Sequence, residues 1–279
     1  MGCSEVQRQL TLSETACRET VEMVAEVDSW QINVTDRAGL IDRILRDVHA
    51  GQGGTVFTIN LDHLSKLRRD EVFRAAYRRA RYVSADGMPV VALAKASGAK
   101  LDRVTGADLV EPLSRAAAAE GVPVYFFGAS EEVLAEAIEH LRERIPGLIV
   151  AGFEAPPMGF DPFGEAAAEA ARRIAASGAG ICFVALGAPK QELFADAAVQ
   201  TAGGVTYLGI GAALDFIAGR KLRAPRIFQA LGMEWLWRAG QEPARLVPRY
   251  FVNGLWLIGY LMRLVVNGGS TTLSSNRRD

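Results

Sequence analysis

Three long polar side chains follow a glycine–proline turn in the segment GAPKQE, residues 187–192. Because the turn comes directly after a buried-looking apolar run, Lys190, Gln191 and Glu192 are expected in the first turn of a helix. Pro189 suits the first helical position, and the free N–H groups at such a helix start can bind an anion. Gln191 could then hydrogen-bond a neutral group such as a base or a sugar. A plain turn followed by a solvated helical turn explains the same residues equally well.

Asp86 is a candidate general base. It lies in the segment SADGMP, between an apolar run and a helix that carries Pro89 in its first turn. A carboxylate at the mouth of a crevice can take a proton from a substrate. The same position is also where a helix N-cap belongs, and the residues alone favour the cap. Thr58 and Asn60 end another apolar run, and they too are either active-site residues or ordinary strand-end and helix-cap residues.

The elements that must position these residues alternate along the chain. Six short runs rich in β-branched and aromatic residues are expected to form strands: 55–60, 81–85, 122–128, 148–152, 180–186 and 204–210. Amphipathic stretches between them are expected to form helices, among them 64–80, 89–97, 130–145 and 163–177. This alternation predicts an α/β fold, with a largely parallel sheet of about six strands and helices on both faces. Ligands bind outside the carboxyl ends of the strands in such folds.

Glycines and polar residues collect where the predicted strands end, which places a crevice at that edge of the sheet. They are Thr58, Asn60, Asp86, Gly128, Gly187, Gly211 and Asp215. The segment GIGAAL has Leu214 at the third glycine position of the dinucleotide fingerprint and follows the last strand, which argues against a dinucleotide-dependent oxidoreductase. The three histidines are far apart and no Asp-x-Asp pair occurs. We therefore expect no metal and no other cofactor, so that arginines would neutralise any bound diphosphate.

Positive charge is concentrated at the end of the chain. The net charge is −1, but residues 219–279 carry ten Lys or Arg against three acidic residues. Such an asymmetry indicates a partner of opposite sign: phosphates, nucleic acid or an anionic membrane. Nucleic acid is disfavoured as a partner because the pI is near 6.4 and the sequence contains no recognisable nucleic-acid-binding motif. Arginine and tryptophan beside an apolar face are typical of an interfacial helix, although an ordinary packed amphipathic helix has the same composition.

These patterns divide the chain into four segments. We expect a loose N-terminal leader at 1–30, a catalytic domain at 31–218, a basic, aromatic-rich appendage at 219–265 and a disordered tail at 266–279. The longest apolar run of the appendage is too short to span a bilayer. Three scattered cysteines and a polar first segment without signal-peptide character predict a cytoplasmic protein.

Six motifs of the chain resemble those of the WecG/TagA/CpsF glycosyltransferases, glycosyltransferase family 26. They are ADGMPVV, RVTGADL, YFFGAS, GAPKQE, GIGAALDFIAG and RAPRIFQALGMEWLWRAGQEPARLVPRY, in the family's order and spacing over roughly residues 30–265. The resemblance implies a Rossmann-like domain with a C-terminal appendage that docks on the inner face of the plasma membrane. It also implies transfer of a sugar, often of N-acetylmannosamine type, from a UDP donor to a polyprenyl-diphosphate-linked acceptor. The implied reaction inverts the anomeric centre and uses no metal.

The resemblance also assigns roles to particular residues. It makes Asp86 the catalytic base, and it places Thr58 and Asn60 where they would orient the reacting sugars. Positions that match the substrate site are Arg103, Thr105, Gly106, Gly128, Gly187, Lys190, Gln191, Glu192, Gly211, Asp215 and Arg223. The appendage arginines that would meet a diphosphate are Arg238, Arg245 and Arg249. An oligomer is compatible with the sequence, and the alternative is a non-catalytic membrane adaptor, against which the retention of Asp86 and its neighbours argues.

Overall fold

A computed structural model describes residues 23–225, 228 and 233–266 of the chain. Its centre is a six-stranded sheet in the order β4-β3-β8-β7-β5-β6, and every neighbouring pair is parallel. The strands are β3 (Gly54–Ile59), β4 (Tyr82–Ala85), β5 (Val124–Gly128), β6 (Val150–Glu154), β7 (Ile181–Ala185) and β8 (Thr206–Gly209). These are the six strands that the apolar runs predict, and the α/β, Rossmann-like fold is confirmed.

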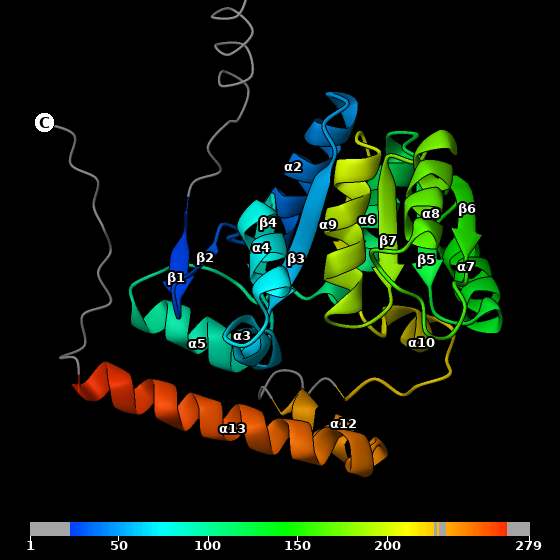
Figure 1. The fold of residues 1–279 in the computed structure, drawn as a ribbon. Helices are drawn as coiled ribbons and strands as arrows, with labels where there is room; N and C mark the ends of the chain where they lie inside the picture. Colours follow the sequence, from blue (N-terminus) through cyan, green and yellow to red (C-terminus); the bar gives the residue numbers. More distant parts are fainter. Residues whose placement is uncertain (1–22, 226–227, 229–232, 267–279) are drawn as a thin grey trace, which may run out of the picture.

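Helices cover both faces of this sheet (Figure 1). One face packs against α2 (Arg37–His49), α6 (Gly106–Ala119), α7 (Glu131–Arg144) and α10 (Ala213–Ile217). The other face packs against α3 (Leu61–Leu67), α4 (Glu71–Arg79), α5 (Met88–Ala96), α8 (Glu165–Ala176) and α9 (Lys190–Thr201). Within β3, Phe57 and Ile59 belong to one hydrophobic core and Val56 to the other. Burial on both faces explains why the strands are continuous apolar runs instead of alternating ones.

The helix predicted at 64–80 is in fact two helices, α3 and α4. They are separated at Asp70, whose side chain accepts a hydrogen bond from the Phe73 N–H at 3.0 Å and so caps the start of α4. An aspartate that satisfies a free N–H group favours a new helix start over continuation of the old helix. The break matters for the site, because it lets α3 run as a short separate helix directly after β3.

A small antiparallel hairpin precedes the domain. Its strands are β1 (Ala25–Val27) and β2 (Trp30–Ile32), and β1 lies within the segment predicted as a loose leader. Asp28, in the turn, forms an ion pair with Arg68 at 2.5 Å. The remainder of the predicted leader, 1–22, and the predicted tail from 267 onward lie outside the described residues.

The predicted appendage contains two described helices, α12 (Glu234–Gln241) and α13 (Pro243–Val266). Figure 1 shows α13 lying across the end of the molecule where α3, α5 and α10 lie, and α13 contacts α3 directly. Trp256 and Tyr260 of α13 are buried and stack on each other, and the Arg68 guanidinium lies 5.0 Å from the Trp256 ring centroid. Among the helices that the structure describes, none combines the length and the apolar character needed to cross a membrane.

Candidate active site

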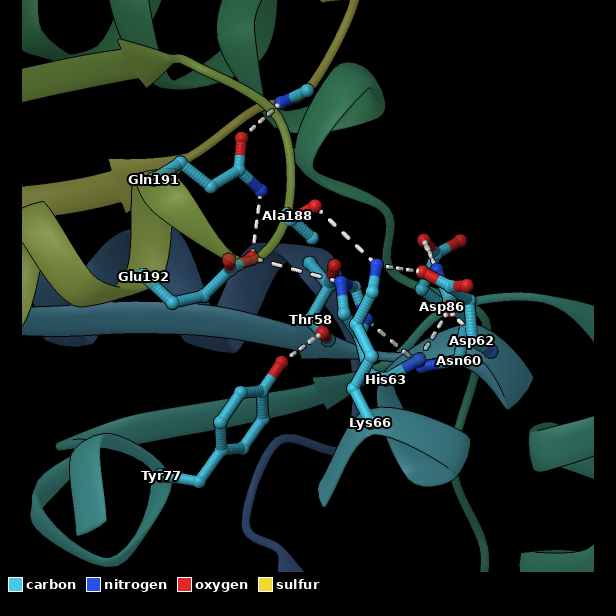
Figure 2. A network of polar contacts seen from close by, with 11 residues as sticks. Thr58, Asn60, Asp62, His63, Lys66, Tyr77, Asp86, Ala188, Gln191 and Glu192 are labelled. Carbon is cyan, nitrogen blue, oxygen red and sulfur yellow. Dashed lines mark hydrogen bonds and ion pairs between the residues drawn. The ribbon is translucent and has the colours of Figure 1, made fainter. Parts of the chain in front are cut away.

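Polar side chains gather where β3, β4, β7 and β8 end (Figure 2). The chain after β4 is held against the end of β3, because the Asp86 N–H donates a hydrogen bond to the Ile59 carbonyl at 2.9 Å. The Asn60 carboxamide Nδ2 then donates to the Asp86 carboxylate Oδ2 at 3.1 Å. Thr58 is buried in β3, and its carbonyl accepts a 2.7 Å hydrogen bond from the Tyr77 hydroxyl. The predicted neighbourhood of Thr58, Asn60 and Asp86 is therefore present in the structure.

Asp86 does not cap a helix. The N-cap of α5 is Gly87, which has a φ of 88° and forms no side-chain capping hydrogen bond. Asn60, in contrast, is the N-cap of α3, and its Oδ1 accepts from the N–H groups of Asp62 at 3.0 Å and His63 at 3.1 Å. These two backbone donors fix the carboxamide with its oxygen inward, so Nδ2 is the atom that faces Asp86. The capping interpretation is thus wrong for Asp86, whereas Asn60 both caps α3 and contacts Asp86.

The first turn of α9 is buried, which excludes the solvated interpretation for two of its three polar residues. Gln191 is 4% exposed and Glu192 is 1% exposed, whereas Lys190 is exposed. Pro189 occupies the N-cap position of α9, one residue earlier in the helix than the sequence suggests.

Gln191 ties the end of β7 to the end of β8. Its side-chain Oε1 accepts from the Gly211 N–H at 2.9 Å, its Nε2 donates to Glu192 Oε1 at 2.7 Å, and its own backbone N–H donates to the Gly187 carbonyl. A Cβ at Gly209 would lie only 2.9 Å from Gln191 Nε2. Gln191 therefore has internal partners for both ends of its carboxamide.

Glu192 is a buried carboxyl group within this cluster. Burial raises its pKa to about 7, and the effect outweighs the lowering by the Gln191 hydrogen bond and by the charge of Lys66. Its Oε1 lies 3.6 Å from His63 Nε2, and its Oε2 has no hydrogen-bond partner among the described residues. A carboxyl whose pKa lies near neutrality exchanges its proton in the physiological range, which is common at functional sites.

Replacing Glu192 by glutamine is expected to change how stability depends on pH. In the folded protein Glu192 keeps its proton up to about pH 7, whereas in the unfolded chain it loses it near 4.5. The free energy of unfolding of the wild type therefore falls as pH rises through this window, and glutamine removes the fall. Relative to the wild type, Glu192→Gln should gain at most about 3 kcal/mol between pH 4.5 and 7. Urea unfolding at pH 5 and pH 8 checks this. Glu143→Gln, on the exposed surface of α7, is the control, and a pH-independent difference for Glu192→Gln would contradict the assignment.

A second group of charged residues lies at the start of α6. Arg103 pairs with Asp108 at 3.5 Å and with Glu234 of α12 at 3.3 Å, and Arg223 also pairs with Asp108. Burial raises the pKa of Asp108, but the nearby Arg223 charge, with hydrogen bonds from Arg223 and Thr105, brings that pKa below its ordinary value. Arg103 belongs to the same edge of the sheet as Asp86, since the next residue, Val104, donates its N–H to the Ala85 carbonyl.

Two glycines of the predicted site allow backbone segments to approach closely. A Cβ at Gly106 would lie 2.3 Å from the Gly209 carbonyl oxygen, so only glycine lets the start of α6 contact the end of β8. Gly128 has a φ of 108°, and a Cβ there would lie 2.6 Å from the Ala185 backbone. Thr105 caps α6 by accepting from the Asp108 N–H at 3.0 Å. These residues shape the edge of the sheet on which the two charged groups lie.

The remaining predicted site residues belong to α10 and to the appendage. Asp215 of α10 pairs with Lys221 at 3.8 Å, and Lys221 also pairs with Glu242 at 3.2 Å. Arg238, Arg245 and Arg249 belong to α12 and α13, but their side chains lie outside what the structure describes.

His63, Lys66, Tyr77 and Asp108 were missed by the sequence analysis. His63 stands three residues after Asn60, where a capping box has its second member, and this spacing was the one available signal for His63. Within the described part of the chain, no group of three or more His, Cys, Asp or Glu side chains could hold a metal ion.

A family model described as "Glycosyl transferase WecG/TagA/CpsF family" matches residues 25–269 of this chain. The match includes the hairpin, the whole sheet and both helices of the appendage.

Proposed function

Because this chain belongs to the WecG/TagA/CpsF family of glycosyltransferases, we propose that it transfers a sugar from a UDP donor to a polyprenyl-diphosphate-linked acceptor in bacterial surface polysaccharide synthesis. The donor sugar is of N-acetylmannosamine type or a related hexose or uronic acid. The observation that carries the proposal is the Asn60–Asp86 contact at the carboxyl edge of the sheet, where ligands bind in folds of this kind.

Asp86 acts as the general base in this proposal. Its carboxylate takes the proton of the acceptor hydroxyl as the hydroxyl oxygen bonds to the anomeric carbon. The bond between that carbon and the UDP oxygen breaks on the opposite face, which inverts the anomeric centre. The Asn60 Nδ2–H on Oδ2 keeps the carboxylate in one orientation through these steps.

Arginines neutralise the departing diphosphate. Arg103 and Arg223 lie at the start of α6, where Asp108 and Glu234 pair with them. A donor diphosphate would compete with these carboxylates for the same guanidinium groups, which can bind phosphate oxygens in pairs. Arg238, Arg245 and Arg249 of the appendage complete the positive surroundings in this proposal.

Turnover is therefore expected to be unaffected by a chelator. A panel of UDP-sugars is incubated with a short prenyl-diphosphate-linked acceptor, with and without EDTA, and product is followed by chromatography. We expect one donor of the panel to be consumed at equal rates in both arms. Activity that EDTA abolishes and Mg²⁺ or Mn²⁺ restores would overturn the arginine account, and consumption of no donor would overturn the proposed reaction.

The appendage attaches the enzyme peripherally to the cytoplasmic face of the membrane in this proposal. Apolar residues at spacings of three and four form one stripe on α13, and each is more than half exposed: Val247, Phe251, Leu255, Ile258 and Met262. Trp256 and Tyr260 lie on the opposite side of the helix and are buried against the domain. A helix with one face packed and an apolar face exposed suits an interface with lipid, and the basic excess of residues 219–279 suits anionic headgroups.

A further inference from the structure

The tautomer of His63 is fixed by its surroundings. His63 is 4% exposed on α3, and its Nδ1 lies 3.3 Å from the Asn60 backbone nitrogen. A backbone N–H can only donate, so Nδ1 must accept and cannot carry a proton. The neutral ring then carries its proton on Nε2, which lies 3.6 Å from Glu192 Oε1. A carboxyl oxygen opposite Nε2 favours the same tautomer.

Asn60 is held at three points, and His63 provides two of them. The Asn60 side-chain Oδ1 accepts from the backbone N–H groups of His63 and Asp62, and the Asn60 backbone N–H donates to the His63 ring. The only remaining polar end of the side chain, Nδ2, contacts Asp86 Oδ2. His63 thus helps to fix the position of Asn60, and Asn60 in turn contacts the carboxylate of Asp86.

The surroundings of His63 keep it away from water. The rings of Phe73 and Tyr77 lie with centroids 6.1 and 6.2 Å from the imidazole. The polar and titratable groups that act on Glu192 are His63, Lys66 and Asp62 on α3 and Gln191 on α9, and Glu192 in turn acts on Tyr77 of α4. Burying a carboxyl and an imidazole costs stability where their hydrogen bonds are incomplete, as they are among the described residues at Glu192 Oε2. Such a cost favours a role for the pair that an apolar pair could not fulfil.

We propose that His63 is a positioning residue for the reaction, which acts on Asp86 through Asn60 and depends on its unprotonated Nδ1. The proposal rests on the proposed function, because it assumes that Asp86 is the base. Its structural alternative is that His63 only completes the capping box of α3. The positioning role and the capping role predict different effects when the imidazole is removed. Loss of a cap lowers stability alone, whereas a misplaced base lowers kcat.

Two substitutions of His63 separate these possibilities. The side-chain oxygen of His63→Asn can occupy the place of Nδ1 and accept from the Asn60 N–H, whereas His63→Leu fills a similar volume but offers no acceptor. We expect kcat, measured with the active UDP-sugar of the panel, to fall less than about fivefold in His63→Asn and about ten- to a hundredfold in His63→Leu. KM for the donor and the affinity for UDP, measured by calorimetry, should change less than about twofold in both.

The Asp86→Asn background tests whether the effect passes through Asp86. If it does, adding His63→Leu to Asp86→Asn lowers kcat less than about twofold further, because residues that act as a unit are not additive. A full multiplicative loss in the double variant, equal losses in His63→Asn and His63→Leu, or near-normal kcat in His63→Leu would each overturn the inference. Near-normal kcat in Asp86→Asn alone would instead overturn the proposed function.

The tautomer can be measured without any substitution. Nitrogen-15 NMR of the histidine-labelled wild type at pH 7.5 should show His63 protonated on Nε2 alone. A ring protonated on Nδ1, or on both nitrogens, could not accept from Asn60 and would contradict the proposal even if the His63 variants fail to fold.

Discussion

Replacing Asp86 by asparagine is expected to lower kcat by at least about a hundredfold, the lower range for a lost general base. The side chain keeps its shape and an oxygen that can accept from Asn60 Nδ2, but it no longer takes a proton from the acceptor. The fold should be unaffected, since the structure gives Asp86 no capping role. Affinity for UDP should also stay near the wild-type value, because the substitution leaves in place the arginines assigned to the diphosphate. Single-turnover kinetics, thermal unfolding and UDP calorimetry on the same preparation measure all three quantities.

Asp102→Asn is the matched control, because it makes the same change of charge at an exposed position of the loop that follows α5. It should retain wild-type kcat, KM and stability. If Asp86→Asn also turned over at a near-normal rate from pH 6 to 9, no proton transfer could be assigned to Asp86. The Asn60–Asp86 contact would then be a structural link between the ends of β3 and β4.

The six strands and their positions along the chain were predictable because they depend on local properties of the sequence. A buried parallel strand must be a short apolar run, and its carboxyl end must lie beside the others, so Asn60 and Asp86 were expected at one edge before any coordinates. Their exact division of labour was not predictable. Which residue caps which helix depends on backbone angles, and the φ of 88° at Gly87 makes glycine the N-cap of α5 and leaves Asp86 for another role.

The burial of the GAPKQE helix start could not be predicted for a different reason. Gln191 and Glu192 are long polar residues, which are exposed in most proteins, and here they are buried by partners distant in sequence. The Gly211 N–H after β8 donates a hydrogen bond to Gln191, and the His63 ring on α3 faces Glu192. The hairpin shows the same limit, because its three-residue strands carry a weak local signal and Asp28 in its turn donates its N–H to the Tyr260 hydroxyl at 3.2 Å.

Placing acidic residues in the exposed stripe of α13 is expected to abolish membrane attachment. In Phe251→Glu/Ile258→Glu, two side chains that are 67% and 57% exposed become charged. Each would otherwise contribute about 1.5–3 kcal/mol by entering the lipid interface, so the partition coefficient onto anionic liposomes should fall at least about a hundredfold. The fold should persist, because glutamate is a good helix former and neither side chain is buried in the protein. Co-sedimentation with phosphatidylserine-containing liposomes, at low and at physiological salt, measures the effect.

The double variant Ile149→Glu/Phe153→Glu controls for the added negative charge. Both side chains are about half exposed near β6, at the opposite end of the sheet order from β4, so liposome binding should fall far less.

Wild-type binding should weaken with salt, since part of the attraction is screened charge, whereas the apolar part persists. Transfer to a lipid-linked acceptor in liposomes should fall with binding in the α13 variant, while transfer to a short water-soluble acceptor stays near the wild-type rate. The idea fails if the α13 variant sediments like the wild type, because the stripe would then have no lipid to enter and α13 would be a packed helix that merely shields α3.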